Sequence, residues 1–158
     1  MIRNTSRNQK AGWVLFLLYL ALLVYFMFFA ESFGRVPDES SAYRYNLELF
    51  REIKRFIHYR DVLGTRALVL NLAGNVVGFI PCGFFLPIVS RRSKRWYNTF
   101  LLCFGFSLCI EVTQLALKVG SFDVDDLLLN TIGGIIGYGC YRTVQAIRIR
   151  RIRRRRRG

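Results

Sequence analysis

Hydrophobic residues gather into four long stretches of the chain, and short charged segments separate these stretches. The stretches cover residues 13–30, about 67–89, about 99–117 and 127–141. The first contains 18 residues without a formal charge, close to the ~20 residues that a helix needs to cross a bilayer. The pattern predicts an all-α integral membrane protein with four transmembrane helices.

The first stretch has a second interpretation, because a basic start followed by an apolar run is also typical of a cleaved signal peptide. Its apolar run is longer than the ~7–15 residues that are usual in signal peptides. Phe28 also stands near its end, where a cleavage site needs a small residue. We therefore expect this stretch to be retained as the first helix.

The segment between the first two stretches, residues 31–66, mixes acidic and basic residues. Within it, the sequence YNLELFREIKRFI spaces its apolar residues at three and four positions, with charged residues opposite them. This spacing predicts an amphipathic surface helix over residues 46–60, with Asn46 as its N-cap and His58 on its solvated side. The helix could lie on the membrane surface or pack as a lid on the protein, and the sequence leaves both open.

Small and polar residues form one face on each of the last three helices, because they recur at intervals of three and four. These residues are Asn71, Gly74, Asn75, Gly78 and Cys82 on the second helix, Cys103, Ser107, Glu111 and Gln114 on the third, and Asp126, Asn130, Gly133 and Gly137 on the fourth. The two G-x-x-x-G steps, Gly74/Gly78 and Gly133/Gly137, predict a close approach of neighbouring helices.

Charge is distributed unevenly along the chain, which has 24 Lys and Arg against 10 Asp and Glu. Residues 1–12, 91–95 and 142–158 hold three, four and nine basic residues and no acidic residue. Because basic loops stay on the cytoplasmic side of a membrane, we expect both termini to be cytoplasmic. The predicted organisation is a basic N-terminus over residues 1–12, a membrane domain over 13–141 and a basic cytoplasmic tail over 142–158.

The basic excess is also typical of nucleic-acid-binding proteins, but here it lies beside apolar spans. We therefore expect membrane lipid, and no nucleic acid, as the partner of the tail. The four cysteines all fall inside apolar stretches and lack the close pairing of metal sites, which favours a packing role. No cofactor is expected.

The last three helices all become polar toward the end that the charge pattern places outside. This predicts an outward-facing ligand-binding cluster of Asn71, Asn75, Glu111, Gln114, Asp125, Asp126 and Asn130. A charged side chain within a span costs on the order of 3 kcal/mol, so Glu111 must be paired, protonated or exposed to water. The alternative is that these groups only hydrogen-bond between helices. Asp123 is expected to cap the fourth helix.

Three blocks of the sequence resemble the signature blocks of VanZ-like membrane proteins. They are NLAGNVVGFIPCGFFLP from Asn71, the pair Glu111 and Gln114, and FDVDDLLLNTIGG from Phe122, while YNLELFREIKRF resembles the block upstream of them. Some relatives have an Arg just before the acidic run, where this chain has Gly120 and Ser121. The resemblance implies a bacterial cytoplasmic-membrane protein, and the founding member of the family is associated with resistance to the glycopeptide teicoplanin. It implies no biochemical mechanism.

Three classes of function are compatible with these features. A binding protein would recognise a cell-wall precursor or a cationic part of a glycopeptide. A metal-dependent hydrolase of an envelope lipid or glycan would hold a divalent cation on Glu111, Asp125 and Asp126. A structural or transport subunit would form a helix–helix oligomer through its G-x-x-x-G faces. Because carboxylate and amide sites leave no distinctive spacing, the sequence assigns no catalytic or metal-binding residue, and we favour binding.

Overall fold

The computed structural model describes residues 7–29, 43–58, 65–90 and 92–155. Within these ranges, the side chains of residues 7–9, 52–53, 56–57 and 65–71 lie outside the description. One of the predicted site residues, Asn71, belongs to this group, so only its place in a helix is described.

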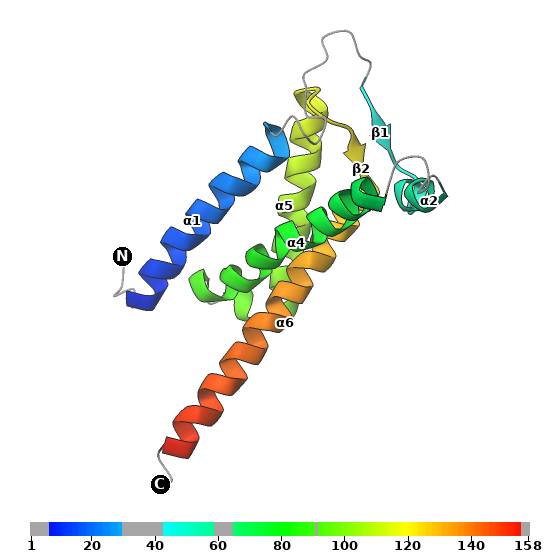
Figure 1. Ribbon diagram of the computed structural model, residues 1–158. Coiled ribbons are helices and arrows are strands. Elements are labelled where there is room, and N and C mark those ends of the chain that lie inside the picture. Colours follow the sequence, from blue (N-terminus) through cyan, green and yellow to red (C-terminus); the bar gives the residue numbers. More distant parts are fainter. Residues whose placement is uncertain (1–6, 30–42, 59–64, 91, 156–158) are drawn as a thin grey trace.

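Helices make up most of the described chain (Figure 1). In chain order the elements are α1 (Arg7–Phe28), β1 (Tyr45–Asn46), α2 (Arg51–His58), α4 (Thr65–Val89), the 3-10 helix η2 (Arg92–Lys94), α5 (Trp96–Ala116), β2 (Phe122–Asp123) and α6 (Val124–Arg155). The two short strands and α2 lie together at one end of the helices, which we call the strand end (Figure 1).

Three of the four predicted spans are confirmed as helices long and apolar enough to cross a membrane. They cover Lys10–Phe28 in α1, Leu72–Val89 in α4 and Trp96–Ala116 in α5. The fourth apolar stretch, residues 127–141, forms the first part of α6, which continues as a helix into the arginine-rich tail. A membrane crossing by α6 remains a prediction.

The closest helix packing joins α4 to α6, which make the most extensive contact in the described structure. At Gly133 a β-carbon would overlap the backbone carbonyl of Val76, and at Gly137 it would overlap that of Ile80. The predicted Gly133/Gly137 step is therefore a site of close approach, where only glycine leaves room for the neighbouring backbone.

Among the described residues of this chain, the predicted Gly74/Gly78 step is not a site of close approach. A β-carbon on Gly74 would meet no described atom within 4 Å, and one on Gly78 would lie 3.7 Å from the flexible side chain of Leu23. Helix α1 packs against α4 here through side chains instead, and the Tyr19 hydroxyl donates to the Gly78 carbonyl at 2.8 Å. The spacing of the two glycines would have allowed a close helix contact. At Gly78, however, the side chains of Leu23 and Tyr19 separate the backbones of α1 and α4.

The apolar core lies between α1, α4 and α5, and its buried members are Phe16, Leu23, Met27, Phe79, Cys82, Cys103 and Ile110. Many other large apolar side chains face outward, including Leu18 on α1, Leu101 on α5 and Ile136 on α6. Exposed apolar surface on this scale is unfavourable in water and suits the hydrocarbon of a bilayer. The lateral surface thus agrees with a membrane protein.

At the strand end, α5 stops in a turn that directs the chain toward β2. Lys118 has φ of 55°, and the Val119 and Lys118 amides donate to the carbonyls of Gln114 and Leu115 at 3.1 and 3.2 Å. This is a Schellman arrangement with Lys118 in the left-handed position. It frees the next residues to pair with β1.

Strands β1 and β2 pair in parallel, with Tyr45 opposite Phe122 and Asn46 opposite Asp123. This pairing explains why the predicted N-cap role of Asn46 is wrong. Helix α2 begins only at Arg51, while Asn46 lies in a strand and directs its amide to Asp123. The residue bonds a distant segment instead of its own helix.

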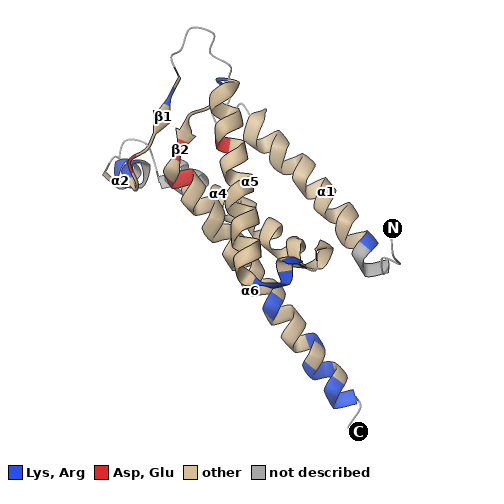
Figure 2. Cartoon of the chain, turned by 180° about the vertical axis from the view of Figure 1, so that it is seen from behind, with Lys and Arg blue, Asp and Glu red and all other residues tan. Residues whose placement is uncertain are grey.

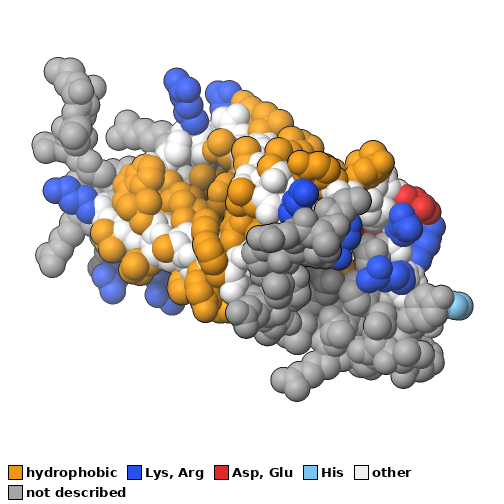
Figure 3. Space-filling model, turned by 90° about the horizontal axis from the view of Figure 1, so that it is seen from above, with side chains coloured by type: hydrophobic (Ala, Val, Ile, Leu, Met, Phe, Trp, Pro, Cys, Tyr) orange, Lys and Arg blue, Asp and Glu red, His pale blue; other side chains and the backbone are white. Residues whose placement is uncertain are grey.

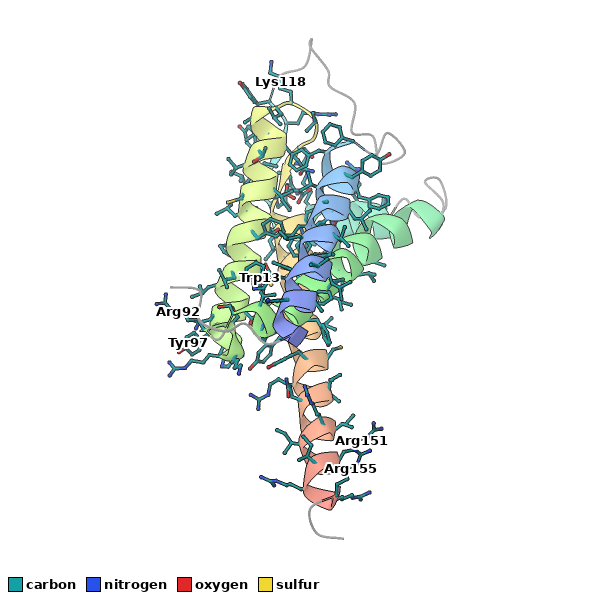
Figure 4. All side chains as sticks on the ribbon, turned by 90° about the vertical axis from the view of Figure 1, so that its left-hand side faces the viewer. Trp13, Arg92, Tyr97, Lys118, Arg151 and Arg155 are labelled. Atoms are coloured by element: carbon teal, nitrogen blue, oxygen red, sulfur yellow. The ribbon has the colours of Figure 1, made fainter. Side chains whose placement is uncertain are left out.

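Acidic and basic residues are distributed differently along the structure. The acidic positions coloured in Figure 2 lie toward the strand end, whereas Lys and Arg positions occur both there, in β1 and α2, and at the opposite end, in η2, the start of α1 and the last turns of α6. In Figure 4, Lys118 marks the strand end, Arg92 lies toward the opposite end, and Arg151 and Arg155 lie beyond it on α6.

Candidate functional site

The candidate site is built around the first turn of α6. Asp123 precedes this helix, and its Oδ1 accepts a hydrogen bond from the Asp125 amide at 2.8 Å. This bond satisfies one of the amides that a helix start leaves without a partner, and the predicted capping role of Asp123 is confirmed. The same oxygen accepts from Asn46 Nδ2 at 3.2 Å, which fixes β1 to the cap.

Glu111 reaches this turn from α5. Its Oε2 accepts from the Asp123 amide at 3.0 Å, and its side chain is only 2% exposed. Both the Glu111 carboxyl and the Asp123 amide are shielded from water, and the hydrogen bond between them offsets the cost of burying them. Glu111 therefore holds the backbone just before α6 against α5.

Asp125 attaches a third segment to the same turn. Its Oδ1 accepts from the Phe50 amide, and the side chain is 1% exposed. Phe50 has φ of 65°, a left-handed conformation that an ordinary residue adopts only where surrounding contacts fix it. The bond to Asp125 is one such contact, and it places the start of α2 beside the start of α6.

Asp126 and Asn75 form a pair between α6 and α4, in which Asn75 Nδ2 donates to Asp126 Oδ1. Asn75 is buried, whereas Asp126 is half-buried and so is the more accessible of the two. The pair lies in the first turn of α6, directly after the capped residues.

The other two described members of the predicted cluster bond elsewhere. Gln114 Nε2 donates to the Met27 carbonyl at 2.8 Å, joining α5 to the end of α1. Asn130 Nδ2 donates to Ser107 Oγ at 2.9 Å, joining α6 to α5 one turn below Asp126. The side-chain amides of Gln114 and Asn130 thus form hydrogen bonds between helices. From the sequence, such bonds were the alternative to ligand binding.

Burial affects the acid–base behaviour of Asp123, which lies outside the predicted spans. Burial raises the pKa of its carboxyl, and the charge of Asp125 acts in the same direction. The hydrogen bonds from the Asp125 amide and Asn46, and the charge of Arg55, oppose this and lower the pKa. The net direction is upward, so the folded protein binds a proton here more readily than the unfolded chain.

Sequence reasoning missed two parts of this arrangement. One is Asn46, whose Oδ1 also accepts from the Glu48 amide at 3.1 Å, a local turn that Asn commonly forms. The other is Ser107, which was placed on a polar face but not joined to Asn130. The sequence Asn-Leu-Glu at residues 46–48 could have indicated the local turn at Asn46. No feature of the sequence indicated that Ser107 bonds Asn130 on another helix.

The described residues contain no group of three or more His, Cys, Asp and Glu side chains that could hold a metal ion. The carboxylates of the cluster instead accept from backbone amides and from Asn side chains. Such an arrangement orders the turn at the start of α6.

Comparisons with known proteins agree with the blocks noted in the sequence. The chain is similar to a protein named Protein VanZ from Enterococcus faecium, with 31% identity over 71 residues. That match covers 45% of this chain and 44% of the relative, so it spans less than half of either protein. No solved structure matches the chain. A sequence model described as VanZ/LLP1 matches residues 16–146, which include all of the predicted site residues. The chain belongs to the VanZ/LLP1 family.

Proposed function

We propose that this protein recognises a cell-envelope component or a glycopeptide through the polar cluster at its strand end, in a role resembling glycopeptide resistance. The proposal is supported by membership of the VanZ/LLP1 family and by the similarity to Protein VanZ. The proposed ligand-binding residues are Asn71, Asn75, Glu111, Gln114, Asp125, Asp126 and Asn130.

The proposed setting is the bacterial cytoplasmic membrane, with four spans and both termini in the cytoplasm. Exposed apolar side chains on α6, such as Ile136 at 44%, support a fourth span. Helix α6 has 32 residues and a length of about 48 Å, more than the ~30 Å hydrocarbon core, so its arginine-rich end would extend past the membrane. The basic segments then mark the cytoplasmic side, and the strand end faces outward.

One observation carries the proposal: four acidic residues at the strand end either belong to the start of α6 or bond to it. Glu111, Asp123 and Asp125 are buried and hydrogen-bonded, and Asp126 beside them is only half-buried. Because Asp126 is the most accessible of the four, its carboxylate would be the point of contact for a cationic group of the ligand. Asp126 would contact the ligand, while Glu111 would hold the turn and add negative charge.

Within this proposed site, Gln114 and Asn130 would also position the other residues. Their bonds to Met27 and Ser107 fix α5 against α1 and α6, which sets the distance between Glu111 and the α6 turn. Asn75 would orient the Asp126 carboxylate through its amide.

The test is a double substitution, Glu111→Gln with Asp126→Asn. Each amide retains an oxygen that can accept the present hydrogen bond, so the fold should persist while two charges are lost. In a host whose teicoplanin resistance depends on this protein, the double variant should lose resistance at a normal membrane level. Glu48→Gln is the matched control, because it removes an exposed acid near the same end. A fully resistant double variant would reject the proposal.

A further inference from the structure

A stripe of basic side chains runs along α2 and has no part in the function proposed above. Arg51, Lys54, Arg55 and His58 follow one another at intervals of three, one and three, which places them on one side of the helix. All four are exposed. Helix α2 contacts α6, and the charge of Arg55 lowers the pKa of the Asp123 carboxyl, which precedes α6.

The segment that leads into α2 exposes a group of large apolar side chains. They are Tyr43, Tyr45, Leu47, Leu49 and Phe50, and Leu47 is 67% exposed. None of them belongs to a predicted span, so hydrocarbon around the spans does not account for their exposure. Clustered apolar exposure beside cationic residues is typical of surfaces that enter the interfacial region of a membrane.

The fold holds this segment in a fixed position. Pairing of β1 with β2 and the bond from the Phe50 amide to Asp125 attach both of its ends to the α6 turn. In Figure 1, α2 is viewed nearly along its axis whereas α6 extends across the picture, so α2 crosses the direction of α6. If α6 crosses the membrane as proposed, a helix with this direction would run closer to the membrane plane than to the direction of α6.

The charged side chains of this region are visible from above. In Figure 3, blue side chains gather with red and pale-blue ones at the edge where Figure 1 places α2. The cationic stripe therefore reaches the molecular surface at the edge of the helices, where lipid head groups would meet it.

We propose that residues 43–58 form a lipid-binding surface on which the α2 stripe seats the phosphate of a lipid head group. Arg and Lys recognise phosphate by charge-assisted hydrogen bonds, and an imidazole N–H can add another. The exposed Tyr, Leu and Phe side chains favour a lipid over a soluble phosphate, because a soluble anion would leave them in water. The inference concerns a second surface and holds whatever ligand the carboxyl cluster binds.

The experiment uses the full chain in a non-ionic detergent, with the imidazole NMR signals of His58 as the probe. His58 is the only histidine in the sequence, so its signals report on this stripe alone. Three probes are added separately: phosphatidic acid, diacylglycerol with the same acyl chains, and inorganic phosphate. Phosphatidic acid should shift the His58 signals to saturation, while diacylglycerol should not and inorganic phosphate should require far higher concentrations.

Matched variants test the stripe itself. Arg51→Gln with Lys54→Gln should raise the half-saturating amount of phosphatidic acid by about 10- to 25-fold, since each cation near an anionic surface contributes about five-fold. Arg151→Gln with Arg155→Gln removes the same charge from the opposite end and should change it by less than about two-fold. Arg51→Lys with Lys54→Arg keeps the charge and should keep the affinity, which distinguishes lost binding from lost folding.

Several results would overturn the inference. An equal shift with diacylglycerol would mean that only apolar contact is sensed, and saturation by inorganic phosphate at the same concentration would mean a soluble-anion site. Unchanged affinity in the Arg51→Gln and Lys54→Gln variant, with its unliganded His58 signals in place, would exclude the stripe as the binding surface.

Discussion

Replacing Glu111 by alanine and by glutamine should separate its structural contribution from its charge. Alanine removes the acceptor of the Asp123 amide, a hydrogen bond of 3.0 Å between two buried groups. Leaving that amide without this partner should cost about 1–3 kcal/mol of unfolding free energy. Glutamine retains an acceptor of the same size for the Asp123 amide and loses the charge-assisted part of that bond, about 1 kcal/mol, which the removal of a buried charge offsets.

The measurement is thermal unfolding of the full chain in detergent, followed by circular dichroism. For a chain of this size, 1 kcal/mol corresponds to about 2–4 °C, so the alanine variant should melt roughly 2–12 °C lower and the glutamine variant within about 4 °C of the native chain. Gln114→Glu, one turn away on the same helix, serves as a control for a charge added to a buried amide. Equal loss of stability in the alanine and glutamine variants would refute the reasoning, because the carboxylate charge would then hold the turn.

Three further predictions concern packing, pH and topology. Gly137→Ala should lower the unfolding free energy by about 1–3 kcal/mol, because its β-carbon would overlap the Ile80 carbonyl. Gly74→Ala is the control, since a β-carbon has space there and the change should be neutral or stabilising. Equal melting temperatures of the two variants would contradict the close approach at Gly137. Because the pKa of Asp123 is raised in the folded protein, its contribution to stability should be greatest below the pKa of the unfolded chain, ~3.9, and should fall as pH rises through the folded pKa. Asp123→Asn keeps an oxygen that can accept the same hydrogen bonds, so it should flatten this part of the pH–stability curve. A reporter fused at Gly120 should be extracytoplasmic and one at Ser90 cytoplasmic, and a cytoplasmic Gly120 reporter would exclude the proposed orientation.

Features that depend on neighbouring positions in the chain could be predicted from the sequence. The three confirmed spans follow from runs of apolar residues, since length and hydropathy alone decide whether a helix can cross a bilayer. The capping bond of Asp123 joins residues two positions apart, so the order Asp-Val-Asp at the start of an apolar helix was sufficient. The family resemblance was carried by short blocks of the same kind, and the match over residues 16–146 confirms it.

Helical phase also indicated which polar residues share a face, but it did not indicate what each face meets. Both G-x-x-x-G steps have the same spacing, yet only Gly133 and Gly137 touch a neighbouring backbone, while Gly78 faces the side chains of α1. Gln114 follows Glu111 on one side of α5, yet its amide bonds Met27 on α1 rather than the α6 turn. A single helix fixes the direction of its side chains, and the packing of the others decides their partners.

Contacts between distant segments were decided by the tertiary structure alone. Asn46 and Asp123 lie 77 positions apart, and their pairing requires the turn after α5 to bring β2 alongside β1. Local propensity made Asn46 a suitable helix cap, but the same side chain forms a strand contact because the Asp123 carboxylate lies opposite it. The sequence by itself determined a membrane protein with acids at one end. The tertiary structure decided that Glu111, Asp123 and Asp125 accept from backbone amides at the start of α6 and just before α2. The physical reason is that helices follow from local hydrogen bonds and hydrophobicity, whereas the partners of a buried carboxylate depend on which segments the fold brings within 3 Å, the usual distance of a hydrogen bond.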